Sequence, residues 1–414
     1  MKKDVVIVGA WLAGLSCAQR LQSAGVDYLI LDASDAVGGR IRTDEVDGFL
    51  LDRGFQVFLT SYPEAQQMLD LEALKLKPFL PGAQVRCNGE FYTMSDPWRQ
   101  PLASLGSVFS PIGTFADKLR VAQLRSRSLN GSLDELWQRP ETTTLATLQG
   151  MGFSQVMIDR FFRPFLGGIF LDSDLQTSSR MFDFVFRMFS LGSATLPASG
   201  IEAIPRQLAT GLPNDRIRLG TRVQSIQEGA VRLDNGDEIH ADAIVIATEG
   251  PNAVSLLGDT VPKQEGQGVT CFYFAADQPP TESPMLMLNG DGRGPINNLC
   301  VPTVVAPTYG PVGQSLISAT VLGVPSDLAE TARQVQTQMS EWFGTAALDW
   351  RHLRTYAIPY ALPRQTPPAL KVPQREVRIQ PGVYVCGDHR DNASINGALV
   401  SGRRAVEAVL ADAK

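Results

Sequence analysis

The residues best suited to chemistry lie near the start of the chain, between an apolar strand and a helix. The β-branched run 4–8 predicts a buried parallel strand, followed by a turn at 9–14 and a helix over 15–24. A helix N-terminus offers free N–H groups and a positive dipole end to phosphate. Asp32 closes a second strand and would accept hydrogen bonds from ribose hydroxyls. The unit predicts a dinucleotide site containing Gly9, Ala13, Gly14, Asp32 and Ala33.

Trp11 departs from the pattern that this turn otherwise follows. The pattern has glycine there because the backbone must lie close against the pyrophosphate. An indole occupies space that the phosphates need, unless the turn directs it outward. Two hypotheses follow. The chain is either an enzyme that binds its dinucleotide, or a degenerate or altered homologue that binds it weakly and acts as a binding protein.

The first residues also allow a second interpretation, as a secretory or lipoprotein leader, because Lys2 and Lys3 precede an apolar run. Asp4 interrupts the basic segment, and Gly14 stands where a lipoprotein leader has an aliphatic residue. We therefore expect this segment to fold as a strand and a helix, in a cytoplasmic protein.

Bulk composition predicts an ordinary globular protein of two domains, because 414 residues exceed what one core usually serves. The net charge of −6 and the lack of a basic run argue against a nucleic-acid partner, and no apolar stretch is long enough for a membrane span. Five scattered cysteines without a Cys-x-x-Cys motif suit reduced thiols. The histidines (His240, His352 and His389) lie too far apart in sequence to suggest a metal site.

A second glycine-rich motif follows Asp32 and makes the interpretation more specific. Gly38 and Gly39 allow the backbone to approach a ligand, and Arg40 is placed to meet phosphate charge. An acid followed by Gly-Gly-Arg after such a unit resembles the flavoprotein amine oxidase superfamily, which includes protoporphyrinogen oxidase, phytoene desaturase and carotenoid isomerase types. The resemblance implies FAD as the cofactor.

Further positions resemble the same superfamily and receive their roles from that resemblance. Gly54, Phe55 and Gln56 would stand near the flavin ring, and Val223 would contact adenine through its backbone. The strand over 382–388 and the helix that follows would complete the site. The resemblance places these residues beside the cofactor: Ala247, Thr248, Gly387, Asp388, Ser394, Ile395, Asn396 and Ala398. The turn at Gly9 and the segment around Asp388 should therefore share one groove.

The resemblance implies an α/β, glutathione-reductase-like flavoprotein of two domains. A Rossmann-type FAD domain would comprise residues 1–59, 196–264 and 361–414, and an α+β substrate domain with a mixed sheet would comprise 60–195 and 265–360. Within these segments, the sequence predicts helices over 115–129 and 133–137 and a hairpin turning at Asn88-Gly89. It also predicts a strand over 298–305.

Phenylalanine is concentrated in the segment 153–189, which holds nine of the 19 in the chain. Phe182, Phe186 and Phe189 share one helix face. A helical core and the lining of an apolar substrate tunnel both explain this pattern. Peripheral contact with a membrane through this face is a third alternative, although no lysine-rich flank supports it. The segment 160–170 resembles the desaturase and protoporphyrinogen oxidase side of the superfamily.

The predicted function is an FAD-dependent oxidoreductase of the oxidase, desaturase or isomerase type, with hydride transfer to flavin N5 from a small or apolar molecule. Gln56 and Tyr360 are ring-facing candidates by family position, and the chemistry requires no side-chain acid or base. The lysine and aromatic pair typical of amine oxidases are not evident, so amine oxidation is not favoured. Substrate, electron acceptor and oligomeric state stay open.

Overall fold

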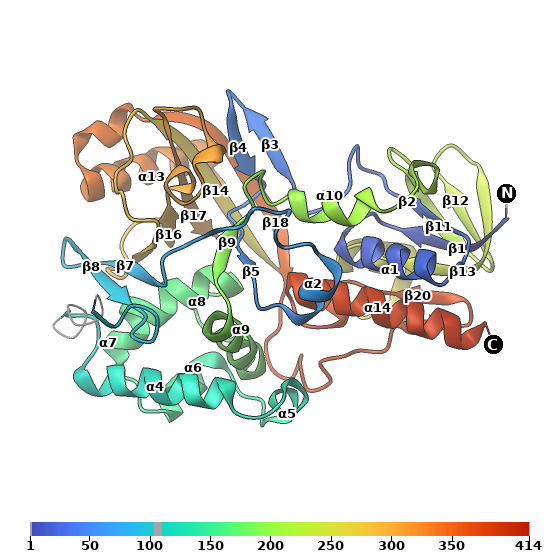
Figure 1. Cartoon of the computed structure of the whole chain (residues 1–414), viewed down its shortest axis with the longest axis horizontal. Helices are drawn as coiled ribbons and strands as arrows, with labels where there is room; N and C mark the ends of the chain where they lie inside the picture. Colours follow the sequence, from blue (N-terminus) through green and yellow to red (C-terminus); the bar gives the residue numbers. More distant parts are fainter. Residues whose placement is uncertain (1, 103–109, 414) are drawn as a thin grey trace.

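The computed structural model describes residues 2–102 and 110–413, which form two lobes side by side (Figure 1). One lobe is built on an eight-stranded sheet and contains both ends of the described chain, and the other is built on a seven-stranded sheet. The long strands β14 (Gly266–Ala276) and β18 (Arg351–Pro363) run from the second lobe toward the first. The predicted α/β class with a mixed sheet is confirmed.

The eight-stranded sheet is parallel at its centre because its strands are apolar on both faces. The strand β1 pairs in parallel with β2 and β13, and β13 also pairs in parallel with β20. Its strands are β1 (Lys2–Val8), β2 (Tyr28–Leu31), β10 (Ile217–Arg218), β11 (Val223–Gln227), β12 (Ala230–Leu233), β13 (Glu238–Ile246), β19 (Arg378–Gln380) and β20 (Val383–Val385). The carboxyl ends of the parallel strands β1, β2, β13 and β20 face one edge, where such sheets bind ligands.

Helices from opposite ends of the chain cover one face of this sheet. The helix α1 (Leu12–Ser23) lies beside α14 (Ile395–Asp412), with α10 (Ala203–Thr210) on its other side (Figure 1). The two long helices approach closely at Gly402, where a Cβ would lie 2.3 Å from the carbonyl oxygen of Ala13. The small residues of both helices therefore bring the start of α14 next to the turn before α1.

The seven-stranded sheet is mixed, with order β18-β14-β17-β16-β15-β7-β8. Only β15 and β7 pair in parallel among these neighbours. Its other strands are β7 (Gly82–Cys87), β8 (Glu90–Ser95), β15 (Leu286–Asn289), β16 (Asn298–Cys300) and β17 (Ser315–Leu322). The predicted hairpin is confirmed: Asn88 and Gly89 both have positive φ, as a two-residue hairpin turn requires.

One strand prediction was partly wrong. The strand predicted over 298–305 ends at Cys300, and residues Pro302–Val305 form the short helix α12. Proline lacks an N–H for the sheet and its fixed φ suits the first turn of a helix, so Pro302 ends the strand.

Helices stack beneath the seven-stranded sheet. The predicted helices over 115–129 and 133–137 are confirmed, each beginning at a capping box. These helices are α4 (Phe115–Leu129), α5 (Leu133–Gln138), α6 (Thr144–Gly150), α7 (Gln155–Met157), α8 (Arg163–Phe170) and α9 (Ser179–Leu191), with α2 (Pro63–Met68), α11 (Gly250–Leu257) and α13 (Leu328–Phe343) elsewhere. A π-helical turn at Ile158–Phe162 joins α7 to α8.

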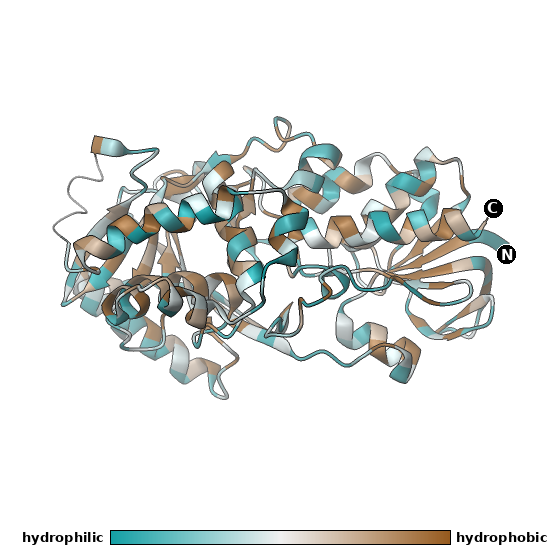
Figure 2. Cartoon of the chain, turned by 90° about the horizontal axis from the view of Figure 1, so that it is seen from below, coloured by the Kyte–Doolittle hydropathy of each residue, from teal (hydrophilic) through white to brown (hydrophobic). Residues whose placement is uncertain are grey.

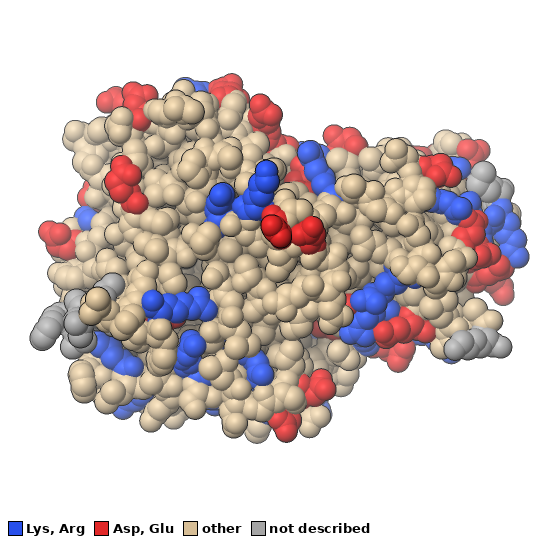
Figure 3. Space-filling model, viewed as in Figure 1, with Lys and Arg blue, Asp and Glu red and all other residues tan. Residues whose placement is uncertain are grey.

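Small sheets connect the two lobes: β3 (Thr43–Val46) with β4 (Phe49–Asp52), and β5 (Phe58–Leu59) with β9 (Ala194–Leu196) and β6 (Lys77–Pro78). Figure 2 shows apolar strands framed by helices that alternate in hydropathy. In the described part of the chain, no helix combines the length and apolar character that a bilayer span needs. Charges of both signs are scattered over the face in Figure 3.

Candidate functional site

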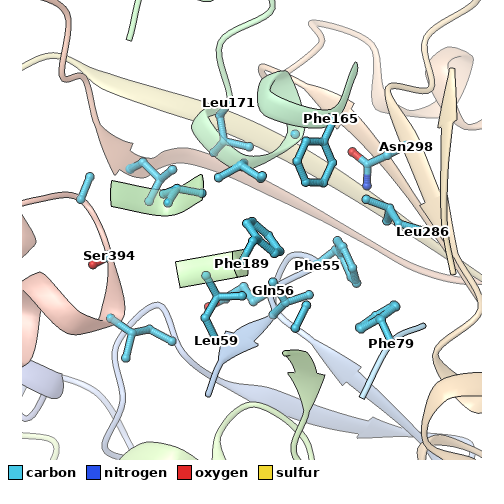
Figure 4. A pocket seen from close by; sticks show the side chains of 18 of the residues that line it. Phe55, Gln56, Leu59, Phe79, Phe165, Leu171, Phe189, Leu286, Asn298 and Ser394 are labelled. Carbon is cyan, nitrogen blue, oxygen red and sulfur yellow. The ribbon is translucent and has the colours of Figure 1, made fainter. Parts of the chain in front are cut away.

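A cavity of about 460 Å³ lies between the lobes and is lined from both of them. We call it the interlobe cavity. One end is formed by the turn before α1, the Gly-Gly-Arg segment and the start of α14. The other end is formed by aromatic and aliphatic side chains of the seven-stranded lobe (Figure 4). Predicted site residues among its lining are Trp11, Ala13, Gly38, Arg40, Gly54, Phe55, Gln56, Ala247, Thr248, Gly387, Asp388, Ser394, Ile395 and Ala398.

The two ends of the chain meet at an ion pair in this cavity. Nη2 of Arg40 lies 2.6 Å from Oδ2 of Asp388, and Nη1 donates to the carbonyl of Ala361 at 2.5 Å. Burial acts to lower the pKa of Arg40, but the neighbouring Asp388 carboxylate outweighs it and the pKa is raised. The groove expected between the first turn and Asp388 is therefore present, with a permanent cation in its wall.

Trp11 lies in the same place. It is the N-cap residue of α1, and its indole packs so closely on Gly39 that a Cβ there would lie 2.1 Å from the ring. The guanidinium of Arg40 lies 5.4 Å from the indole centroid, within cation–π range. The indole thus covers Gly39, next to the cation that the sequence places beside phosphate.

Asp32 is buried behind the turn and is not part of the cavity lining. Its carboxylate accepts from the backbone N–H groups of Ala10 at 2.6 Å and Ser34 at 2.7 Å. Because each carboxylate oxygen has two lone pairs, both can accept further bonds. Ala33 follows Asp32 in the chain, and Gly9 precedes Ala10, whose N–H binds the carboxylate. Gly14 lies against the turn, because a Cβ there would lie 2.0 Å from the Gly9 oxygen.

The segment after β4 forms one wall of the cavity. Gly54 has a φ of +86° and would carry a Cβ only 2.9 Å from Ile358, so this position requires glycine. Phe55 and Gln56 follow along the wall. Nε2 of Gln56 donates to the carbonyls of Arg40 and Arg53, which leaves its Oε1 as the remaining polar atom.

The start of α14 forms the opposite wall. Ser394 caps the helix by accepting from the Gly397 N–H at 3.0 Å, and it lies at the cavity edge in Figure 4. Asn396 turns away, because its Oδ1 accepts from the Glu64 N–H. Oδ1 of Asp388 is buried and has no hydrogen-bond partner among the described residues.

Tyr360 does not line the cavity, although Ile358, Ala361 and Leu362 of the same strand do. The register between β14 and β18 shifts there, which redirects side chains as β-bulges do. The Tyr360 ring packs on Gly266 and lies 5.8 Å from the Arg40 guanidinium. Burial raises the pKa of its hydroxyl. Tyr360 therefore stands behind Arg40 and outside the cavity wall.

Val223, on β11, is also absent from the lining. The pairing of β11 with β12 shifts between Val223 and Ser225, so the backbone at Val223 is irregular. Among the described residues, no group of three or more His, Cys, Asp or Glu side chains is placed to bind a metal ion.

The phenylalanines of the segment 153–189 divide between the core and the cavity wall. Phe182 and Phe184 are buried in the core, whereas Phe161, Phe165, Phe186 and Phe189 line the cavity. Sequence reasoning missed several lining residues because their segments carry no motif and meet only in the folded chain. These are Phe79, Trp98, Arg99, Arg125, Asn298 and Thr320.

Known proteins share parts of this sequence. Protoporphyrinogen oxidase 2 of Arabidopsis thaliana is 27% identical over 175 residues, covering 40% of this chain and 32% of the relative. Phytoene dehydrogenase of Streptomyces griseus is 25% identical over 291 residues, covering 62% of this chain and 56% of the relative. The matched part of the chain thus spans about a third of the length of the first relative and just over half of the length of the second.

Solved structures share the whole fold. An oxidoreductase from Methanosarcina mazei superposes with a TM-score of 0.76 at 20% identity, covering 98% of this chain and all of that one. Putrescine oxidase superposes with a TM-score of 0.74 at 15% identity, covering 99% of both chains. The family profile described as flavin containing amine oxidoreductase matches residues 12–410. The chain therefore belongs to the flavin-containing amine oxidoreductase family, whose members bind FAD.

Proposed function

We propose that this protein is an FAD-dependent oxidoreductase of the oxidase, desaturase or isomerase type, acting on an apolar organic molecule held in the interlobe cavity. The observation that carries the proposal is the continuity of this cavity. It runs from the Arg40–Asp388 pair to a wall of phenylalanines. When bound, FAD would supply the redox chemistry as the hydride acceptor.

The residues present fit a dinucleotide at several points. Asp388 has a buried, unpartnered Oδ1 that can accept from a ribityl hydroxyl. Arg40 supplies a cation for the pyrophosphate, and Asp32 keeps lone pairs for the ribose. The capped start of α14 presents backbone N–H groups and a positive dipole end to the cavity, where they would stabilise negative charge on a bound flavin.

Trp11 opposes this fit, because its indole rests on Gly39 beside Arg40. We propose that the indole turns away when the cofactor binds. The family match over residues 12–410 favours a working enzyme over a degenerate binding protein.

The apolar part of the cavity supports the proposed substrate class. Phe55, Phe79, Phe165 and Phe189 surround it, and they exclude water from the reacting bond (Figure 4). No lysine is found among the described lining residues, so the residue that marks amine oxidases is not part of this wall. Desaturation, oxidation or isomerisation of an apolar molecule suits this wall better than binding a charged amine.

We propose that residues 1–59, 196–264 and 361–414 form the cofactor domain, and that residues 60–195 and 265–360 form the substrate domain. The segregation of strands between the two large sheets supports this division. A cytoplasmic location is also proposed, since all five cysteines are free and buried.

The test is the spectrum of the purified protein. Stoichiometric flavin absorbance is expected, and it should bleach without air when the substrate is added. Polyenes, porphyrinogens and amines are the classes to screen. A protein that is colourless after incubation with excess FAD and removal of the unbound cofactor would refute the proposal.

A further inference from the structure

Two uncharged polar side chains, Asn298 and Thr320, line the interlobe cavity. Figure 4 shows Asn298 beside the apolar side chains of Phe165 and Leu286. We infer that Asn298 and Thr320 form a subsite for one uncharged oxygen of the substrate, a carbonyl or a hydroxyl, on an otherwise apolar molecule. This inference rests on the proposed function, because it treats the interlobe cavity as the substrate site.

The sheet places the two side chains together. Asn298 on β16 and Thr320 on β17 are direct cross-strand partners, so their side chains project from the same face. Both residues are 3% exposed, and both line the cavity. Their location is therefore the cavity wall and not the outer surface.

The Asn298 amide is held in one orientation. Its Oδ1 accepts from Nδ2 of Asn297 at 2.8 Å, and that same Nδ2 donates to the carbonyl of Pro164 at 2.9 Å. Gly168 leaves room for this arrangement, because a Cβ there would lie 2.7 Å from Oδ1 of Asn298. With the oxygen engaged, Nδ2 is left with no acceptor among the described residues. It points toward Leu286 and the cavity in Figure 4.

Thr320 also has a polar atom that lacks a hydrogen-bond partner. Its Oγ1 is buried without a hydrogen-bond partner among the described residues. A buried polar group without a hydrogen-bond partner destabilises the folded protein, because it has lost its bonds to water. One ligand oxygen with two lone pairs can accept from the Asn298 N–H and the Thr320 O–H together. Both groups then have a hydrogen-bond partner.

Charged side chains of the lining are already engaged. Arg99 donates to the carbonyls of Phe189 and Gly192 at the end of α9. Arg125 donates to the Ser190 carbonyl and lies over the Trp98 ring. Asn298 Nδ2 and Thr320 Oγ1 are therefore two neighbouring neutral donors of the lining that stay available to a ligand oxygen.

The test compares binding of two neutral ligands to the purified holoenzyme by calorimetry: the apolar ketone β-ionone and the hydrocarbon with the same carbon skeleton. Wild-type protein should bind the ketone about fivefold to tenfold more tightly, the value of one or two net hydrogen bonds. Asn298→Leu should abolish this preference, and Thr320→Val should reduce it. Leu286→Met, a change in the neighbouring apolar wall, should retain it.

A second readout is the carbonyl stretching frequency of bound β-ionone, which a hydrogen bond lowers. An equal preference in wild type and Asn298→Leu, or binding of neither ligand, would overturn the subsite. Both measurements are independent of turnover. A flavin-free or unbleachable protein that still prefers the ketone would refute the proposed function and leave the subsite standing.

Discussion

Arg40 and Asp388 are separated by 348 positions and form an ion pair with 2.6 Å between Nη2 and Oδ2. The contact joins the Gly-Gly-Arg segment near the start of the chain to the Gly-Asp segment near its end. Asp388 is almost fully buried, with a side chain 8% exposed. The two halves of the proposed cofactor site are therefore linked by a charge pair before any ligand enters.

Removing either partner should leave the other as an uncompensated charge. Arg40→Met and Asp388→Asn are each expected to lower the free energy of unfolding by about 3 kcal/mol. The double variant should lose about 2 kcal/mol less than the sum, measured by urea unfolding. Arg364→Met breaks an exposed pair with Glu265 and should change little. Additive losses would mean that the two residues act independently.

Trp11→Gly should restore the space over Gly39 that the pyrophosphate needs. We expect the dissociation constant for FAD to fall on the order of tenfold to a hundredfold, the value of one or two charge-assisted hydrogen bonds. Titration of flavin-stripped protein with FAD measures this change. Trp350→Phe, which alters a tryptophan packed on Phe343, is the control. An unchanged constant would show that the indole leaves the site without cost.

Gly14→Ala should destabilise the turn before α1. The added Cβ would lie 2.0 Å from the backbone oxygen of Gly9, and backbone gives way less easily than a side chain. A loss of about 1–3 kcal/mol is expected from such overpacking. Gly150→Ala, at a helical position with no neighbour within 4 Å, should be neutral or slightly stabilising. Equal effects in thermal unfolding would contradict this close approach.

Phe182 and Phe189 should separate core packing from cavity lining. Phe182 is fully buried, so Phe182→Ala should cost about 3–5 kcal/mol of unfolding free energy. Phe189 lines the cavity, so Phe189→Ala should cost less and instead weaken binding of apolar ligands. Chemical unfolding and ligand titration of both variants provide the comparison. The reverse ranking would place Phe189 in the core.

Asp52 should make stability depend on pH. It accepts from Thr43, Ile201 and Tyr309, yet burial raises its pKa from 3.8 to about 6. The folded state thus binds the proton more tightly than the unfolded state.

The stability that this proton contributes is fully present below about pH 4, and it is lost as the pH rises through 6. The shift corresponds to about 3 kcal/mol. Unfolding wild type and Asp52→Asn at pH 4 and pH 7 isolates this effect. The stability advantage of wild type over the variant should be about 2 kcal/mol larger at pH 4 than at pH 7. An equal difference at both pH values would contradict this effect.

Local signals in the sequence predicted the elements around the proposed cofactor site well. The β-branched run at 4–8 forms the predicted strand. Gly38, Gly387 and Asp388, which belong to motifs that need particular backbone conformations, line one cavity. The prediction that the strand continues beyond Cys300 was wrong, because Pro302 begins the short helix α12. Local chemistry of this kind acts over a few residues, so it can be seen in the sequence.

The position of Tyr360 and the pairing of Asn298 with Thr320 could not be seen there. Tyr360 leaves the cavity wall because a register shift between β14 and β18 redirects it. Asn298 and Thr320 meet because β16 and β17 pair in one register. Likewise, the sequence marks Trp11 as unusual, but only packing places its indole on Gly39. Strand register and side-chain packing depend on contacts between segments far apart in the chain. A pattern of neighbouring residues therefore does not predict them.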